Sequence, residues 1–472
     1  MYRTPSTVYH QPYFMQLPHI PPYKTKVVEP VYFRTKAERA AKIKAVNYNL
    51  FNLHSDWVII DLMTDSGTGA MSEQQWAEIM LGDESYAGSE SYFKLKRSVK
   101  EIMGFEYLAP THQGRAAENI LFSAVVKDGN VVPGNAHFDT TKGHIEFRKA
   151  EAIDCTIKEA FNTQTYHPFK GNIDIDKLEG IIKKYGKDRI PFINITVTCN
   201  TVGGQPVSLA NIKATCQLAK KYGIPIYMDI ARYAENAYFI KVREAAYQDW
   251  SIAEIVKEMF KEVSVVWMSS KKDGLVNIGG FIALNDAELY EKLGQFTIIY
   301  EGFLTYGGMS GRAMGALAVG LKEGVEFDYL NDRVKQVQYL AKKLKAYNIP
   351  IQEPVGGHAI YIDAKKMLPH IPQTQYPAQL LGVKMYIEGG VRGVEIGTLL
   401  ADRDPITGKD RLPEMELLRL AIPRRVYSRN HMDYIAATLA NVAARSKDIK
   451  AGFRIKKQAA ILRHFTVELE KL

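Results

Sequence analysis

The sequence predicts an α/β protein in which a mostly parallel sheet is joined to a smaller α+β domain. Between about residues 190 and 285, short runs rich in β-branched and aromatic residues alternate with stretches of helix length. This alternation is typical of βαβ units and a parallel sheet. From about residue 325 to residue 472 the pattern changes to longer helices and shorter strands. A chain of 472 residues is long enough for two or three domains with large cores.

Local signals place the individual elements. Strands are predicted at 192–198, 224–229, 263–268 and 280–284. A helix is predicted over 208–222, because Ser208 can cap its start and Gly223 can end it. Further helices are predicted at 35–50, 251–260, 334–347 and 431–445. Ligands of such sheets bind beyond the carboxyl ends of the strands, so polar residues there are candidate site residues.

The ends of the chain suggest how these elements divide into domains. Residues 1–33 are predicted as an N-terminal arm, because prolines throughout the segment exclude a regular helix. Its tyrosines favour docking on a neighbouring surface as much as a frayed terminus. We expect residues 34–60 and 325–472 to form the small domain and residues 61–324 to form the large domain.

Composition and charge exclude several classes of protein. With 46% hydrophobic and 24% charged residues, the chain is neither disordered nor fibrous. The net charge of +9 arises from 61 basic and 52 acidic residues, so nucleic acid and membrane surfaces are not expected partners. The densest basic stretch, 445–463, is interleaved with apolar residues and is predicted to be a solvated helical face.

The cysteines and the apolar runs indicate a cytoplasmic location. Cys155, Cys199 and Cys216 are odd in number and widely spaced, which fits neither a disulfide framework nor a zinc motif. Reduced cysteines are typical of the cytosol. The chain begins with no signal-peptide pattern, and no apolar run is long enough to span a membrane. We therefore expect a soluble, cytoplasmic protein.

Two polar sites follow predicted strands. Lys271 and Lys272 follow the strand 263–268 after two serines, at a position where burial and like charge would lower a lysine pKa and favour a Schiff-base amine. Asp229 ends the strand 224–229, with Arg232 three residues later, and a carboxylate there can pair with a protonated pyridine nitrogen. A solvated turn and a structural ion pair are the ordinary alternatives.

Two further sites suit anions. Gln113, Gly114 and Arg115 stand where a helix should begin, and a helix N-terminus binds anions through free N–H groups. Arg419 lies in an apolar, strand-like run, where it needs a carboxylate partner from the substrate or from the protein. An anion site, a strand-end aspartate and a strand-end lysine in one α/β frame are what a pyridoxal phosphate enzyme requires.

Longer motifs identify a family resemblance from about Val28 to the C-terminus. The chain resembles the β-eliminating lyases, which comprise tryptophanases and tyrosine phenol-lyases. The resemblance implies the aspartate aminotransferase-like fold of pyridoxal phosphate enzymes (fold type I). The motifs that carry it are DLMTDSGTGAMS, GDESYAGSESY, PTHQGRAAEN, GGQPVSLAN, ARYAENAYFIK, MSSKKDGLVNIGGF, TYGGMSG, PVGGHA and LRLAIPRRVY.

The resemblance assigns residues to the coenzyme, pyridoxal 5'-phosphate. It implies that Lys272 forms the Schiff base, that Phe138 stacks on the ring and that Asp229 pairs with the ring nitrogen. Asn200 and Arg232 would address the phenolic oxygen. The full coenzyme set that it implies is Gln113, Gly114, Arg115, Phe138, Asn200, Asp229, Arg232, Ser269, Lys271 and Lys272.

The resemblance also assigns substrate, catalytic and cation residues. The substrate carboxylate would bind to Thr64, Ser66, Asn200 and Arg419. The catalytic residues implied are Lys272, Tyr86, Asp139 and His464. A potassium ion would bind Glu84 and the backbone oxygens of Gly67 and Asn277. The family further implies a homotetramer whose active sites are shared between subunits.

Four positions distinguish the two branches of the family. Asp139, Val394, Ile396 and His464 resemble the indole-releasing branch, since an apolar wall suits indole whereas a phenol requires a buried polar partner. We expect conversion of L-tryptophan to indole, pyruvate and ammonia. The alternatives are a tyrosine phenol-lyase, a pyridoxal phosphate aminotransferase and, from another class, a non-catalytic or RNA-binding module.

Overall fold

A computed structural model describes residues 19–404, 407–460 and 462–472, and it confirms the α/β class. Its larger part is built on a seven-stranded sheet with the strand order β2-β8-β7-β6-β5-β3-β4. Only β8 runs antiparallel to its neighbours, so the sheet is mostly parallel as predicted. The strands are β2 (Tyr107–Thr111), β3 (Val131–Gly134), β4 (Glu151–Asp154), β5 (Ile193–Thr196), β6 (Ile226–Asp229), β7 (Val265–Ser269) and β8 (Gly280–Leu284).

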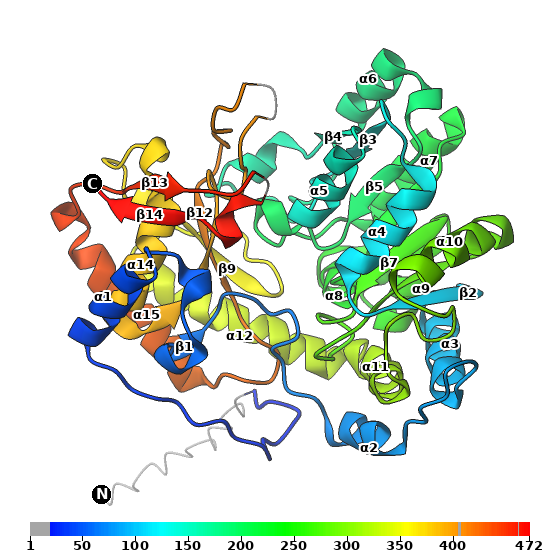
Figure 1. The fold of residues 1–472 in the computed structure, drawn as a ribbon, viewed down its shortest axis with the longest axis horizontal. Helices are drawn as coiled ribbons and strands as arrows, with labels where there is room; N and C mark the ends of the chain where they lie inside the picture. The colour runs from blue at the N-terminus through cyan, green and yellow to red at the C-terminus, as the bar shows by residue number, and fades with distance from the viewer. Residues whose placement is uncertain (1–18, 405–406, 461) are drawn as a thin grey trace, which may run out of the picture.

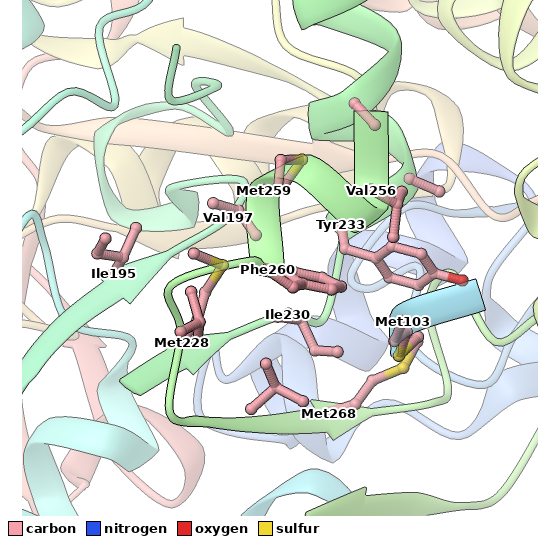
Figure 2. Packing of buried hydrophobic residues seen from close by; sticks show 14 of the residues in the cluster. Met103, Ile195, Val197, Met228, Ile230, Tyr233, Val256, Met259, Phe260 and Met268 are labelled. Atoms are coloured by element: carbon pink, nitrogen blue, oxygen red, sulfur yellow. The ribbon is translucent and has the colours of Figure 1, made fainter. Parts of the chain in front are cut away.

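Helices flank this sheet, and the strand alternation explains how both of its faces are buried. In β7, Val266 and Met268 pack into one core while Val265 and Trp267 pack into another on the opposite face. Figure 2 shows Met228 and Met268 of the sheet in the same buried cluster as Phe260 of α9. The helices are α2 (Glu73–Leu81), α3 (Glu90–Met103), α4 (Gly114–Val125), α5 (Asp139–Phe147), α6 (Ile175–Tyr185), α7 (Leu209–Tyr222), α8 (Tyr233–Arg243), α9 (Ile252–Phe260), α10 (Ala287–Tyr300) and α11 (Gly311–Gly324).

The remaining elements form a second body with its own hydrophobic core (Figure 1). This core joins residues 43–63 to residues 337–469 around the antiparallel sheet β11-β12-β9. Its helices are α1 (Lys36–Ala45), α12 (Phe327–Ala346), α13 (Ala364–Met367), α14 (Pro377–Gly389) and α15 (Arg429–Ala444). Its strands are β1 (Ile60–Asp61), β9 (Ala359–Asp363), β10 (Val391–Arg392), β11 (Val394–Ile396), β12 (Leu417–Ala421), β13 (Phe453–Lys457) and β14 (Glu468–Lys471).

The long helix α12 connects the two bodies. Its N-terminal half contributes Leu330 and Val334 to the core of the larger body, whereas Val337 and Leu344 belong to the core of the second. Figure 1 shows α12 lying across the middle of the molecule. The predicted N-terminal arm is described only from His19 onward; residues 1–18 of it lie outside the described residues.

Most local predictions are confirmed, but that for the basic stretch 445–463 is wrong. Ser208 caps α7 by accepting the Asn211 N–H at 3.0 Å, and Gly223 ends it with a left-handed φ of 68°. Helix α15 ends at Ala444, and the described residues of the basic stretch include a short 3₁₀ helix (Ser446–Asp448) and strand β13. Its last member, Arg463, is fully buried rather than solvated.

The predictions about cysteine and membrane can also be compared with the structure. All three cysteines are buried free thiols, so no disulfide forms between them. Among the helices within the described ranges, none is both long and apolar enough to cross a membrane.

Candidate active site

A cavity opens at the carboxyl ends of β5, β6 and β7. This is the edge at which such sheets bind ligands, because three strands that run in the same direction end there. The predicted residues that line it are Ser66, Gln113, Gly114, Arg115, Phe138, Asn200, Asp229, Arg232, Ser269, Lys271 and Lys272.

Lys272 reaches the cavity from the loop that follows β7. Its Nζ donates to Ser269 Oγ at 2.9 Å and lies 5.9 Å from the centre of the Phe138 ring. Burial lowers the pKa of this amine to about 8, with a further contribution from the Arg232 guanidinium. The neighbouring like charge is therefore that of Arg232 and not, as predicted from the sequence, that of Lys271. An amine with this pKa is available as a nucleophile near neutral pH.

Asp229 faces the same cavity from the end of β6. It accepts the Ala231 N–H at 3.0 Å, and burial raises the pKa of its carboxyl group. Lys272 and Arg232 oppose this rise only in part. A buried carboxylate in this setting is stabilised by a cation placed next to it, and a protonated ring nitrogen would supply one.

The start of α4 forms an anion-binding corner with the end of β7. Gln113 caps α4 without a side-chain hydrogen bond, so the first N–H groups of the helix remain available. Gly114 packs so tightly on Ser269 that an added Cβ would lie 2.6 Å from the Ser269 Cβ. Arg115 and Lys271 add positive charge. This corner fits a phosphate group, and together with Phe138, Asp229 and Lys272 the cavity fits pyridoxal phosphate.

On the side of the second body, Arg419 contacts a residue of the cavity lining. Arg419, on β12, donates through Nη1 to Asn200 Oδ1 at 3.0 Å and through Nη2 to the Met63 carbonyl at 3.0 Å. Its Nε is buried with no partner in the described structure, as expected where a ligand is to bind. The Ser66 N–H donates to Thr64 Oγ1 at 3.0 Å, which fixes this segment beside Met63.

The four positions assigned to the side-chain pocket lie beside the cavity but do not line it. His464 Nε2 is 3.7 Å from Asp139 Oδ2, and Asp139 directly follows Phe138. Val394 pairs with Arg419 across β11 and β12, so Val394, Ile396 and Arg419 share one face of this hairpin. Burial lowers the pKa of His464, although Asp139 acts in the opposite direction.

Tyr86 and the three predicted cation ligands also lie outside the cavity lining. Tyr86 is 71% exposed, and its ring packs on Phe303 and Tyr306. The Gly67 segment adjoins Asn277, whose Nδ2 donates to the Gly67 carbonyl at 2.9 Å. Glu84 instead forms an ion pair with Arg312 at 3.1 Å. In the described ranges, no cluster of three His, Cys, Asp or Glu side chains could hold a metal ion.

Several residues of the cavity are not predicted from the sequence, and Glu118 is the most informative of them. Glu118 lies on α4 and accepts a hydrogen bond from Thr140 Oγ1 at 2.6 Å. Burial raises the pKa of its carboxyl group to about 7, and Asp229 adds to this rise. The spacing of residues along the helix does not by itself show that the side of α4 that carries Glu118 faces β6. The other missed lining residues are Thr140, Thr196, Thr198, Ala231 and Trp267.

A buried network of charges supports the cavity from behind. Arg232 donates to Asp65 at 2.7 Å, and Arg424 donates to Asp65, Glu235 and Asp273, each at 2.8 Å. Asp273 directly follows Lys272. The network therefore connects the Lys272 loop to the strand β12 side of the molecule.

Comparison with known proteins agrees with this geometry. A family model described as beta-eliminating lyase matches residues 61–438. The chain belongs to the beta-eliminating lyase family. It is thus a lyase, and both its family and its fold support pyridoxal phosphate as its cofactor.

Similar proteins carry the names of both branches of the family. The chain is 57% identical to a "Probable beta-eliminating lyase" of Trichomonas vaginalis, with 97% of this chain and 100% of that protein covered. It is 51% identical to a "Tryptophanase" of Salinibacter ruber (95% and 95% covered) and 49% identical to a "Tyrosine phenol-lyase" of Pasteurella multocida (95% and 98% covered). Overall identity therefore leaves the substrate open.

Solved structures confirm the fold at much lower identity. A Pyrococcus protein described as protein-A1 is 14% identical with a TM-score of 0.60, covering 88% of this chain and 100% of its own. A structure described as SPT with PLP is 12% identical with a TM-score of 0.57, covering 87% of this chain and 97% of its own. These similarities support the pyridoxal phosphate fold type I expected from the sequence.

Proposed function

We propose that this lyase converts L-tryptophan to indole, pyruvate and ammonia. The observation that carries elimination is the meeting of Lys272, Asp229 and the anion corner of α4 in one cavity. The observations that favour tryptophan are the buried apolar side chains of Val394 and Ile396 on the hairpin, together with the His464–Asp139 pair. An apolar wall accepts a bicyclic aromatic ring without leaving a buried polar group unpaired.

Different residues of the site bind the coenzyme and the substrate. The first N–H groups of α4, with Arg115 and Lys271, hold the phosphate, and Phe138 packs on the ring. Arg419 and Asn200 hold the substrate carboxylate, which aligns the Cα–H bond with the Lys272 amine. Pyridoxal phosphate, when bound, supplies the electron sink that makes this Cα proton acidic.

Proton movement is carried by side chains at both ends of the substrate. Lys272 removes the Cα proton, for which its pKa of about 8 is suited. Asp229 holds a proton on the coenzyme ring nitrogen. Indole leaves as a neutral molecule only after its C3 carbon is protonated. The candidate donors are Tyr86 and the His464–Asp139 pair, which lies 3.7 Å apart.

The second candidate function is that of a tyrosine phenol-lyase. Relatives with this name are 49% and 46% identical to the chain, similar to those named tryptophanase. Phenol has a hydroxyl group that needs a buried partner, and the apolar side chain of Ile396 offers none. This is the reason for preferring tryptophan.

Assembly, cation and location complete the proposal. Tyr86 is exposed in the single chain, so we propose a homotetramer in which Tyr86 reaches the cavity of a second copy. We propose that potassium binds the carbonyl oxygens of Gly67 and Asn277 together with Glu84. A cytoplasmic location is proposed from the reduced cysteines.

The deciding experiment measures the released aromatic product. The purified protein is loaded with pyridoxal phosphate in potassium buffer and incubated separately with L-tryptophan and L-tyrosine. We expect indole and pyruvate in equal amounts from tryptophan, with a much smaller kcat/KM for phenol release. A kcat/KM that is larger for tyrosine would establish the second candidate, and transfer of the amino group to a keto acid without pyruvate would indicate an aminotransferase.

A further inference from the structure

The back of the hairpin that carries Ile396 holds two buried carboxyl groups. Glu395 lies on β11 and Glu416 directly precedes β12, and they are only 3% and 0% exposed. A Cβ on Gly397 would lie 2.7 Å from Glu395 Oε1 and would also clash with Glu416 Oε2, so the two carboxyl groups converge on one point. Two carboxylates in such a place cannot both be ionised without a large cost.

These carboxyl groups bind the turn that follows Ile396. The N–H groups of Leu399 and Leu400 each donate to Glu395 at 3.0 Å. The Thr398 N–H donates to Glu416 Oε1 at 2.7 Å, and the Thr398 hydroxyl donates to the same oxygen. The other oxygen, Glu416 Oε2, is buried without a partner in the described structure. A proton shared with Glu395 would satisfy it.

Arg463 holds the opposite side of the same turn. Its Nη2 donates to the Thr398 carbonyl at 2.8 Å and its Nε donates to the Leu399 carbonyl at 3.3 Å. The next residue in the chain is His464, which lies 3.7 Å from Asp139. The turn 397–400 is therefore continuous with Ile396 on one side and is clamped to the His464 segment on the other.

We propose that Glu395 and Glu416 share one proton and, as a unit, position the wall that receives the aromatic leaving group. The pair does not touch the substrate, because Glu395 and Ile396 are consecutive in a strand and point to opposite faces. It acts through the placement of Ile396 and His464, and so it determines how tightly an amino acid with an aromatic side chain binds. This inference rests on the proposed function, since it assigns Ile396 and His464 to the side-chain pocket.

The groups around Glu395 and Glu416 favour a state in which the two carboxyl groups keep one proton between them. Burial raises the pKa of Glu395 well above its usual value, with a further rise from Glu416, and burial raises the pKa of Glu416 as well. The charged and titratable groups that face the pair come from three segments and are Lys365, Tyr376 and Arg463, and Asp402 and Asp410 in turn face Arg463. Arg463 is already paired with Asp410 at 2.6 Å.

Two matched substitutions distinguish the positioning of the pocket wall from the loss of one negative charge in the pair. Glu416→Gln removes one carboxylate, but its amide oxygen can still accept the Thr398 N–H and its NH₂ can donate to Glu395 as the shared proton does. Glu395→Gln removes the same charge but directs NH₂ toward the N–H of Leu399 or Leu400. We expect Glu395→Gln to raise the KM for tryptophan about 10-fold, the usual effect of one lost buried acceptor, while Glu416→Gln keeps KM low.

A substrate with a small leaving group supplies the control. β-Chloroalanine shares the α-carbon chemistry of tryptophan, but its chloride does not reach the wall. We expect its kcat and KM to be the same in both variants as in the unchanged chain. Equal losses for both substrates, or a Glu416→Gln variant as impaired as Glu395→Gln, would overturn the proposal. If the unchanged chain prefers tyrosine, the proposed substrate is wrong, and tyrosine then replaces tryptophan in this comparison.

A thermal measurement tests the shared proton without any activity. The folded chain keeps a proton that the unfolded chain releases above the ordinary carboxyl pKa, so the pair lowers stability as pH rises. We expect the melting temperature of the unchanged chain to fall more between pH 5 and pH 9 than that of Glu416→Gln. An equal fall in the two proteins would show that no proton is shared.

Discussion

Burial shifts the pKa values of individual side chains in the cavity. Burial lowers the pKa of the Lys272 amine to about 8, whereas it raises the pKa of the Asp229 carboxyl group. Both shifts favour the neutral forms in the absence of a ligand. A coenzyme with a cationic ring nitrogen would return Asp229 to its charged form, which is how this site can combine a base and an electrostatic partner.

Lys272→Ala is expected to remove the covalent attachment of the coenzyme. Lys272 is the buried amine of the cavity, so the variant should yield no borohydride-reducible coenzyme on the protein and should lose elimination by at least about 10³-fold. Lys271→Ala is the matched control, because it removes the adjacent lysine but leaves the reducible linkage in place. Retained elimination in Lys272→Ala would remove Lys272 from the mechanism.

Ile396→Arg combined with Asp139→Thr is expected to reduce the use of tryptophan. The new guanidinium would stand on the buried hairpin face next to Val394, where indole offers it no partner. We expect kcat/KM for tryptophan to fall about 10²-fold, the scale of an unpaired buried polar group, with a smaller fall for tyrosine. Unchanged tryptophan activity would refute the assignment of this wall.

The site also requires close contact between helix α4 and strand β7. Helix α4 meets the end of β7 at Gly114 and Ser269, and this contact shapes the anion corner. Because an added Cβ would lie 2.6 Å from Ser269 Cβ and 2.9 Å from Ser269 Cα, the two elements would have to separate. The geometry of the anion corner therefore depends on the absence of a side chain at Gly114.

Gly114→Ala is expected to weaken coenzyme binding. Separation of α4 from β7 should raise the dissociation constant of pyridoxal phosphate at least about 10-fold, as a 1.4 kcal/mol change does, measured by titration of absorbance. Gly180→Ala is the control, because Gly180 lies in α6 and an added Cβ meets nothing within 4 Å. That variant should bind the coenzyme normally and gain about 0.5–1 kcal/mol of stability.

The sequence predicts strand ends better than side-chain environments. Asp229 ends β6 as expected, and β7 ends at Ser269, one residue beyond the predicted strand 263–268, because apolar runs and turn residues define strand limits locally. Glu118 was missed since only the packing of α4 against the sheet brings it to Asp229. Arg463 was assigned to a solvated face from charge alone, but Asp410 and two backbone carbonyls bury it. Such contacts arise between distant segments and leave no local pattern.

Across the whole chain, the proposed potassium site depends on residues from separate segments. Replacing potassium by sodium at constant ionic strength is expected to lower kcat/KM several-fold, because carbonyl oxygens such as those of Gly67 and Asn277 replace the hydration shell of potassium. Glu84→Gln should reduce this difference between the two ions. Glu101→Gln, which removes a surface partner of Lys322, should leave the difference intact. Equal activity in both salts would contradict the site.

The buried charge network joins the two bodies of the molecule, and Arg424 is at its centre. Arg424 is the shared donor of Asp65, Glu235 and Asp273, and it lies on the chain just after β12. The network contains three acids, which are Asp65, Glu235 and Asp273. It also contains three arginines, which are Arg232, Arg333 and Arg424. Removing one arginine leaves a buried acid without its partner.

Arg424→Gln is expected to lower the free energy of unfolding by about 3–5 kcal/mol. Arg425→Gln is the matched control, since Arg425 pairs with Glu323 outside the network, so this variant should lose less stability than Arg424→Gln. The pKa of Asp273 is raised to about 6, first by burial, even with Arg424 present, and the variant should raise it further. The folded variant then holds a proton that the unfolded chain releases, so its loss of stability should be larger at pH 8 than at pH 5. Denaturant unfolding at both pH values measures this, and a loss independent of pH would show that the acids are not coupled through Arg424.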